Sequence, residues 1–216
     1  MKNYIFLALC CLIFVGCKKE PLYSSGNVTS EIRKVANFTA IKIEGANVLD
    51  VDYGETFRVE IIGSDNLLKH YKTDVVSGVL YLGFNRDHIN NSDVKIFVTL
   101  PRLSKIAASG SSEVMISGDF SPQNSFTAEA TGTGNIIATR PFTVDNLIIK
   151  GEGAAKMYLN RIKSKTADIN LEGSGEVNVT VSDHLKVKIL GSSRVYCEGN
   201  PTVDSDIVGS GSVNKY

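Results

Sequence analysis

The chain of 216 residues is 43% hydrophobic and 21% charged, a composition typical of a folded protein and not of a disordered one. Its 23 basic and 23 acidic residues cancel and are spread without long runs, so we predict no nucleic-acid partner. The 19 glycines and the absence of tryptophan favour many tight turns over a few long helices.

Residues 1–16 have the features of a secretory signal peptide, including a short apolar run over residues 4–15. This run is too short for a spanning helix, which needs about 20 apolar residues. The pair Gly16-Cys17 at its end resembles the cleavage site of a bacterial lipoprotein, although Phe14 stands where leucine is usual. We therefore expect a lipoprotein signal with lipidation of Cys17; an ordinary signal peptide with a chance cysteine is the alternative.

Lipidation of Cys17 would attach the chain to a membrane, with residues 17–26 as a tether. The charged residues Lys18-Lys19-Glu20 resemble the signals that send some lipoproteins of gram-negative bacteria to the outer surface. We expect a lipid-anchored protein of the cell envelope, at the outer membrane of a gram-negative bacterium and facing either the periplasm or the outside. Cys197 then lacks an intramolecular partner, so no disulfide framework is predicted.

Residues 27–100 are predicted to be a strand-rich N-terminal part. Within it, residues 52–55 are predicted to form a hairpin turn, and Gly45 to mark a divergent repeat. Ser64 or Asp65 is expected to cap a short helical turn. Further strands are predicted over residues 78–84 and 94–100.

Residues 101–216 are predicted to be a solenoid built from repeats of about 20 residues. Apolar residues alternate on both sides of a recurring glycine, which indicates strand, turn and strand in every unit. Glycine reaches the positive φ that a sharp corner needs, and one unit cannot bury its apolar face alone, so we expect stacked rungs. Six units align on glycines at intervals of 22, 19, 22, 18 and 18: Gly110, Gly132, Gly151, Gly173, Gly191 and Gly209.

The stacking also predicts neighbours on adjacent rungs. Asp168, Lys186 and Asp204 each stand five residues before an aligned glycine. Adjacent strands are about 4.8 Å apart, so these side chains would form a ladder of alternating charge.

A resemblance to a known family lies in three segments: FRVEIIGSDNLLKHYKTDVVSGVLYLGF, VTLPRLSKIAASGSSEV and GNPTVDSDIVGSGSVNKY. With them the chain resembles the putative auto-transporter adhesin, head GIN domain proteins, over residues 38–216. The resemblance implies an all-β, right-handed parallel β-helix-like solenoid on an envelope protein, often a lipoprotein. In that case residues 27–216 form one continuous head GIN domain.

Catalysis is a further possible function of such a fold, because parallel β-helices also house polysaccharide lyases and hydrolases. A glycosidase needs two carboxyl groups about 5 to 9.5 Å apart. Glu113 and Glu176 share one column but are three rungs apart, which is about 14 Å. Cys197 falls in an inward column and is expected to be a core residue. The three histidines lack metal-ligand spacing, so we predict no catalytic residue, no metal and no cofactor.

Three outward residues form the predicted ligand face. Tyr158 and Tyr196 fall at outward or edge positions, and their flat apolar rings could stack on a sugar. Arg194 would complete this sugar-stacking face. The leading hypothesis is a non-enzymatic cell-envelope lipoprotein that acts as an adhesin or surface-interaction module. Its anchor would bind the membrane, and its solenoid would bind a glycan or protein partner. The alternative is a glycan-binding or carbohydrate-active β-helix protein, and a third is a structural role with partners at a terminal edge strand.

Overall fold

The computed structural model describes residues 20–86 and 88–216, so the predicted signal peptide and the lipidation site at Cys17 lie outside the described residues. The regular secondary structure of these residues is nearly all strand and forms a β-solenoid of about five turns, which confirms the predicted all-β solenoid. Within these residues, no helix combines the length and the apolar character that crossing a membrane requires.

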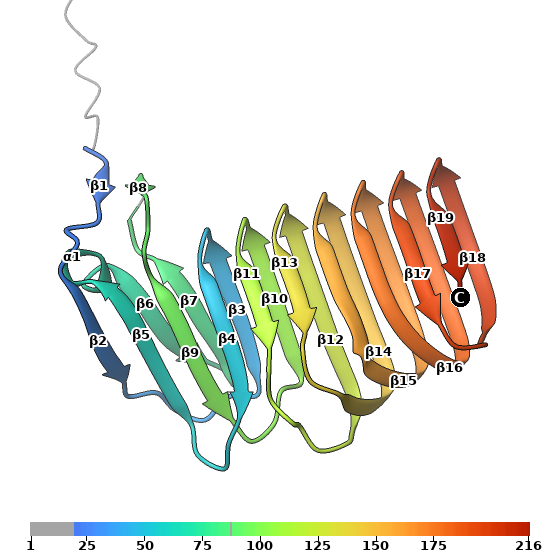
Figure 1. Ribbon diagram of the computed structural model, residues 1–216, viewed down its shortest axis with the longest axis horizontal. Helices are drawn as coiled ribbons and strands as arrows, with labels where there is room; N and C mark the ends of the chain where they lie inside the picture. The colour runs from blue at the N-terminus through green and yellow to red at the C-terminus, as the bar shows by residue number, and fades with distance from the viewer. Residues whose placement is uncertain (1–19, 87) are drawn as a thin grey trace, which may run out of the picture.

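Each rung of the solenoid has an incoming strand that runs to a corner glycine and an outgoing strand that leaves it (Figure 1). The incoming strands are β3 (Ala40–Gly45), β10 (Lys105–Gly110), β12 (Gln123–Gly132), β14 (Phe142–Gly153) and β18 (Thr202–Gly209). The outgoing strands are β4 (Val48–Tyr53), β11 (Glu113–Ile116), β13 (Asn135–Ala138), β17 (Arg194–Glu198) and β19 (Ser212–Lys215). The long strands β15 (Lys156–Gly173) and β16 (Glu176–Gly191) begin as outgoing strands and end as incoming ones. Strands of each kind pair in parallel with their own kind, giving an incoming and an outgoing sheet.

The corner glycines stack in register from rung to rung, and each has a positive φ: Gly45, Gly110, Gly132, Gly153, Gly173, Gly191 and Gly209. A Cβ on Gly153 would lie 2.7 Å from the carbonyl oxygen of Gly132. The same oxygen accepts a hydrogen bond from the amide of Ala154 at 2.8 Å. Glycine therefore permits both the corner's backbone angle and the close stacking of rungs. The prediction that Gly45 belongs to a divergent repeat is confirmed.

The alignment of the third repeat on Gly151 is wrong, because Gly153 occupies that corner. Gly151 is paired with Ala130 and Leu171 and lies in an inward column. A Cβ at Gly151 would come within 2.8 Å of Leu171 Cδ2 and 3.1 Å of Met157 Cε, so larger neighbours already fill its space. The alignment was shifted by two residues, which is one full period of a strand, so the prediction of inward and outward side chains is unaffected.

The core lies between the two sheets and is filled by the inward columns, most of whose side chains are fully buried. Where the outgoing sheet turns back toward the incoming one, the rings of Phe120, Phe142 and Phe126 pack edge to face. On the outer surface, Asp168 is paired with Lys186 and Lys186 with Asp204, so the predicted charge ladder is confirmed in register.

The N-terminal strands extend both sheets beyond the first rung. They comprise β1 (Leu22–Tyr23), β2 (Val28–Arg33), β5 (Arg58–Ser64), β6 (Tyr71–Val76), β7 (Val79–Phe84), β8 (Ile89–Asn90) and β9 (Lys95–Leu100). β7 pairs in parallel with β3, and β6 pairs antiparallel with β7. β9 pairs in parallel with β4, β5 pairs antiparallel with β9, and β2 pairs antiparallel with β5. β1 and β8 form a separate parallel pair.

The predicted hairpin turn at residues 52–55 is wrong. β4 and β5 do not pair with each other, because β9 lies between them and binds both. For example, Asp50 of β4 is paired with Phe97 of β9, and Phe97 is paired on its other side with Glu60 of β5. The connection from β4 to β5 therefore crosses the end of β9, where the amide of Gly54 donates a hydrogen bond to Leu100.

The predicted helical turn is α1 (Asp65–Leu68), with Ser64 at its N-cap position. Ser64 does not cap the helix with its side chain. Its hydroxyl instead donates to Asp93 Oδ2 at 2.6 Å and accepts from the amide of Gly26 at 3.0 Å. Burial raises the pKa of Asp93, but the hydrogen bonds from the hydroxyl and amide of Ser64 outweigh it and leave that pKa below its usual value. This buried serine thus links three segments of the N-terminal part.

Candidate interaction face

The outer face of the outgoing sheet carries one row of uncharged side chains, which we call the tyrosine row. The row consists of Met115, Ile137, Tyr158, Asn178, Tyr196 and Asn214. Each lies five residues after its corner glycine, where the alternation turns the side chain outward, and the first five each stand between two buried neighbours. The first five are partly exposed and Asn214 is exposed. The strands therefore hold a continuous uncharged stripe across six rungs.

The structure brings the predicted ligand residues Tyr158, Arg194 and Tyr196 onto this one face. Asn178 lies between the two tyrosines, one strand from each. Arg194 flanks the row, with Nη2 4.0 Å from Glu176 Oε2. Partial burial, and then the neighbouring Glu176 carboxylate, raises the pKa of Tyr158, so its hydroxyl stays protonated at neutral pH. Their role as a ligand face stays a prediction.

Asn178 contributes an unusual acceptor to the middle of the row. Its Oδ1 is buried and has no hydrogen-bond partner among residues 20–86 and 88–216. An acceptor left in this state costs free energy, about 1 to 3 kcal/mol in typical proteins. Because this oxygen is buried, a donor from outside the chain would reach it only if the Asn178 side chain turned outward.

Sequence reasoning missed four members of the row: Met115, Ile137, Asn178 and Asn214. The signal was present, because all six members share the same offset from the corner glycine. Aligning the third repeat on Gly151 moved Tyr158 to a different offset, and the column could not be recognised.

The outer face of the incoming sheet has a different character. There, Glu129 Oε2 lies 2.7 Å from Lys105 Nζ, and Glu129 Oε1 lies 3.7 Å from Lys150 Nζ. These residues occupy three adjacent strands, so ion pairs cover this part of the surface. The two faces of the solenoid thus offer different chemistry to a partner.

The candidate catalytic groups do not converge. Glu113 and Glu176 are separated by two intervening strands, as expected, with Asn135 and Lys156 between them in the register. Cys197 is buried in the core as predicted, and burial raises the pKa of its thiol. Within the described ranges, no group of three histidine, cysteine or acidic side chains is placed to hold a metal ion.

Fold and face together define a β-solenoid protein with an extended, flat lateral surface. The family described as "Putative auto-transporter adhesin, head GIN domain" matches residues 37–160 and 143–201. The chain belongs to this family, as the sequence resemblance indicated. Membership in a family of adhesin-like proteins indicates a protein of the cell surface or envelope. No protein with a curated description matches the chain.

Solved structures share the fold. The crystal structure of a putative adhesin from Bacteroides fragilis has 17% identity and a TM-score of 0.75, covering 90% of this chain and 100% of its own. A putative lipid binding protein from Parabacteroides distasonis has 20% identity and a TM-score of 0.58, covering 91% and 100%. A putative adhesin from Parabacteroides merdae has 15% identity and a TM-score of 0.57, covering 91% and 99%.

Proposed function

We propose that this protein is a non-enzymatic, lipid-anchored adhesion module of the cell envelope that binds other surfaces through the tyrosine row. One observation carries the proposal: the row is uncharged and partly exposed over adjacent rungs, with a tyrosine on either side of Asn178. Strands paired on both sides hold the two tyrosines and Asn178 in place, so little conformational entropy is lost on binding. Tyrosine rings add apolar contact area together with a polar tip.

The partner is a glycan or a protein. Family membership supports adhesion, and two of the similar crystal structures are themselves described as adhesins. Another similar structure is described as a lipid binding protein. Glycan binding is the form of this function that the two tyrosines favour, because a sugar ring packs its apolar face on an aromatic ring.

Removing both rings of the row should weaken adhesion. We expect the double variant Tyr158→Ser, Tyr196→Ser to bind at least about tenfold more weakly on a glycan and extracellular-matrix array, as expected when two central aromatic contacts are lost. Tyr23→Ser is the matched control, because Tyr23 is exposed and lies in β1, away from the row. Undiminished binding by a folded double variant would exclude the row as the adhesion surface.

Lipid attachment at Cys17 has a separate test. Stable anchoring needs two or more acyl chains, so Cys17→Ala should move the protein from the membrane fraction to the soluble fraction. Cys11→Ala is the control and should stay with the membrane, since Cys10 and not a small residue precedes it. Cell fractionation followed by immunoblotting measures both, and membrane retention of the Cys17→Ala protein contradicts the anchor.

A further inference from the structure

A hollow lies on the outer face of the incoming sheet at its N-terminal end, far along the chain from the tyrosine row. It has a volume of about 320 Å³ and spans β3, β7 and β6. Gly83 forms its floor beside Lys72, to which it is paired. We call it the Gly83 hollow; the residues that shape it are Lys42, Glu44, Lys72, Asp74, Tyr81 and Gly83.

The role of Gly83 in this hollow differs from that of the corner glycines. The φ of Gly83 lies outside the left-handed region, so its backbone does not require glycine. A Cβ there would make only ordinary contacts of 3.5 Å with Glu44. The missing side chain therefore leaves open space between Glu44 and Lys72 without any demand of folding.

An aromatic ring forms the wall of the hollow. Tyr81 is 39% exposed and lies between Lys42 and Asp74 in the register. Lys42 Nζ is 5.9 Å from the ring centroid and 2.8 Å from Glu44 Oε1. The hydrogen bond and then the charge of Glu44 raise the pKa of Lys42, so the ammonium group stays charged beside the ring. The charged group therefore lies over one side of the Tyr81 ring.

The charges around the hollow cancel. Two lysines, Lys42 and Lys72, alternate with two acids, Glu44 and Asp74. Lys72 and Asp74 are exposed and form no ion pair within residues 20–86 and 88–216, so their polar atoms are available to a ligand. An anion would meet two carboxylates and a cation two ammonium groups at short range. A neutral ligand with many hydroxyl groups can instead donate to the acids and accept from the lysines.

We propose that the Gly83 hollow is a saccharide site that takes one neutral pyranose ring. The apolar face of the sugar packs on Tyr81, its edge lies over Gly83, and its hydroxyls bond to Lys72 and Asp74. This site is distinct from the tyrosine row, because it lies on the other sheet and uses no residue of the row. It adds a specificity pocket that the adhesion proposal does not require.

Saturation-transfer NMR on the full-length protein tests the site with three probes: methyl β-galactopyranoside, methyl α-mannopyranoside and N-acetylglucosamine. We expect at least one probe to bind with a millimolar Kd. Tyr81→Ala should weaken that binding about tenfold or more, because the ring face is lost. Gly83→Val should do the same by filling the floor, while a valine in a strand keeps the fold. Tyr81→Phe keeps the ring and should retain most of the binding.

A change of charge in the hollow tests why its ligand is expected to be neutral. Asp74→Lys leaves three lysines against one acid, so the variant should gain binding of N-acetylneuraminic acid, an anionic sugar, and lose binding of the neutral probes. The double variant of the tyrosine row should bind the neutral probes unchanged, which separates this site from the adhesion surface. The proposal is overturned if no neutral probe binds, or if binding survives Tyr81→Ala in a protein with unchanged circular dichroism.

Discussion

Gly153→Ala should destabilise the protein by about 2 to 5 kcal/mol, measured as the free energy of unfolding in guanidinium chloride. A positive φ costs an alanine about 1 to 2 kcal/mol. Forcing a Cβ to 2.7 Å from the Gly132 oxygen adds a crowding cost of about 1 to 3 kcal/mol. Relieving the clash by separating the rungs stretches the hydrogen bond from Ala154 to the same oxygen. The new methyl group therefore weakens the stacking of rungs whichever way the backbone moves.

Gly78→Ala is the matched control for this prediction. Gly78 has a φ of +76°, close to the +87° of Gly153, but a Cβ there meets nothing within 4 Å. The control should therefore cost only the conformational part, about 1 to 2 kcal/mol. If both variants lose the same stability, close stacking of the corner contributes nothing and only the backbone angle selects glycine.

The solenoid was predictable from sequence because its two signals are local. The alternation around each glycine fixes which side chains point inward, and a corner of positive φ selects glycine at every rung. The choice between Gly151 and Gly153 was not predictable from the same signals, because both glycines precede an alternating segment. The register of the stacked rungs shows that Gly153, with its positive φ, is the corner, while Gly151 lacks a side chain because Leu171 and Met157 fill the space beside it.

The strand order of the N-terminal part could not be predicted from the sequence, because it depends on pairings between distant segments. A turn at residues 52–55 between two strand-like segments favours a hairpin by local pattern alone. β9, more than 40 residues further along the chain, takes the place between β4 and β5. Its parallel pairing with β4 continues the outgoing sheet, and this buries Leu49 and Val51 against the core. Tertiary burial thus overrides the local turn preference.

The two candidate sites also differ in how far they could be predicted from the sequence. Tyr158, Arg194 and Tyr196 could be placed on one face from alternation alone, although the full row needed the correct corner glycine. The Gly83 hollow had no sequence signal, because it arises from the pairing of β3, β7 and β6 and from a glycine whose backbone does not require it. Sites that form between strands distant in sequence become visible only once the register is known.

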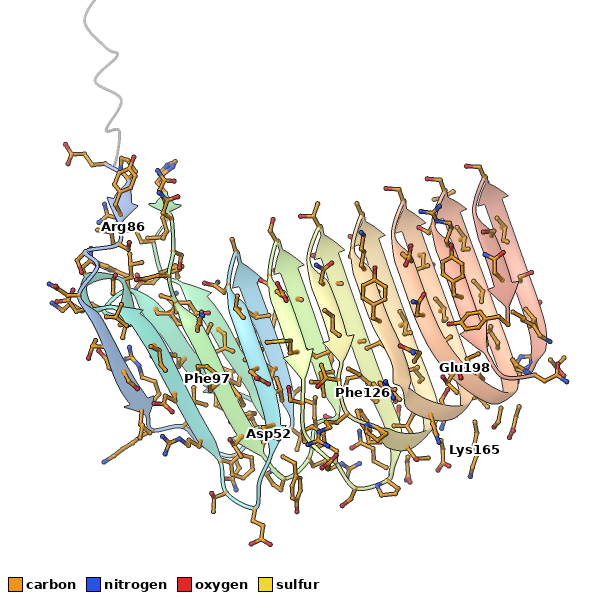
Figure 2. All side chains as sticks on the ribbon, viewed as in Figure 1. Asp52, Arg86, Phe97, Phe126, Lys165 and Glu198 are labelled. Atoms are coloured by element: carbon orange, nitrogen blue, oxygen red, sulfur yellow. The ribbon has the colours of Figure 1, made fainter. Side chains whose placement is uncertain are left out.

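Phe126→Ala should strongly destabilise the core where the outgoing sheet turns back toward the incoming one. Phe126, labelled in Figure 2, is 0% exposed. Its ring centroid lies 5.6 Å from that of Phe142, with an interplanar angle of 83°. Truncation of a buried phenylalanine costs about 3 to 5 kcal/mol, and an edge-to-face ring pair accounts for about 0.5 to 1.5 kcal/mol of such a loss. Phe97→Ala is the control, since Phe97 is 40% exposed on the outer face, and it should cost less than about 1 kcal/mol.

The position of Phe126 also predicts where stability is lost. β12 lies between β10 and β14, and in a solenoid each rung is stabilised mainly by its immediate neighbours. Hydrogen exchange should therefore show the largest loss of amide protection in β10, β12 and β14, and a smaller loss in β17 and β19. Loss of protection spread evenly over all rungs would mean that the solenoid unfolds as one cooperative unit. In that case a defect in one rung would weaken the tyrosine row and the Gly83 hollow to the same extent.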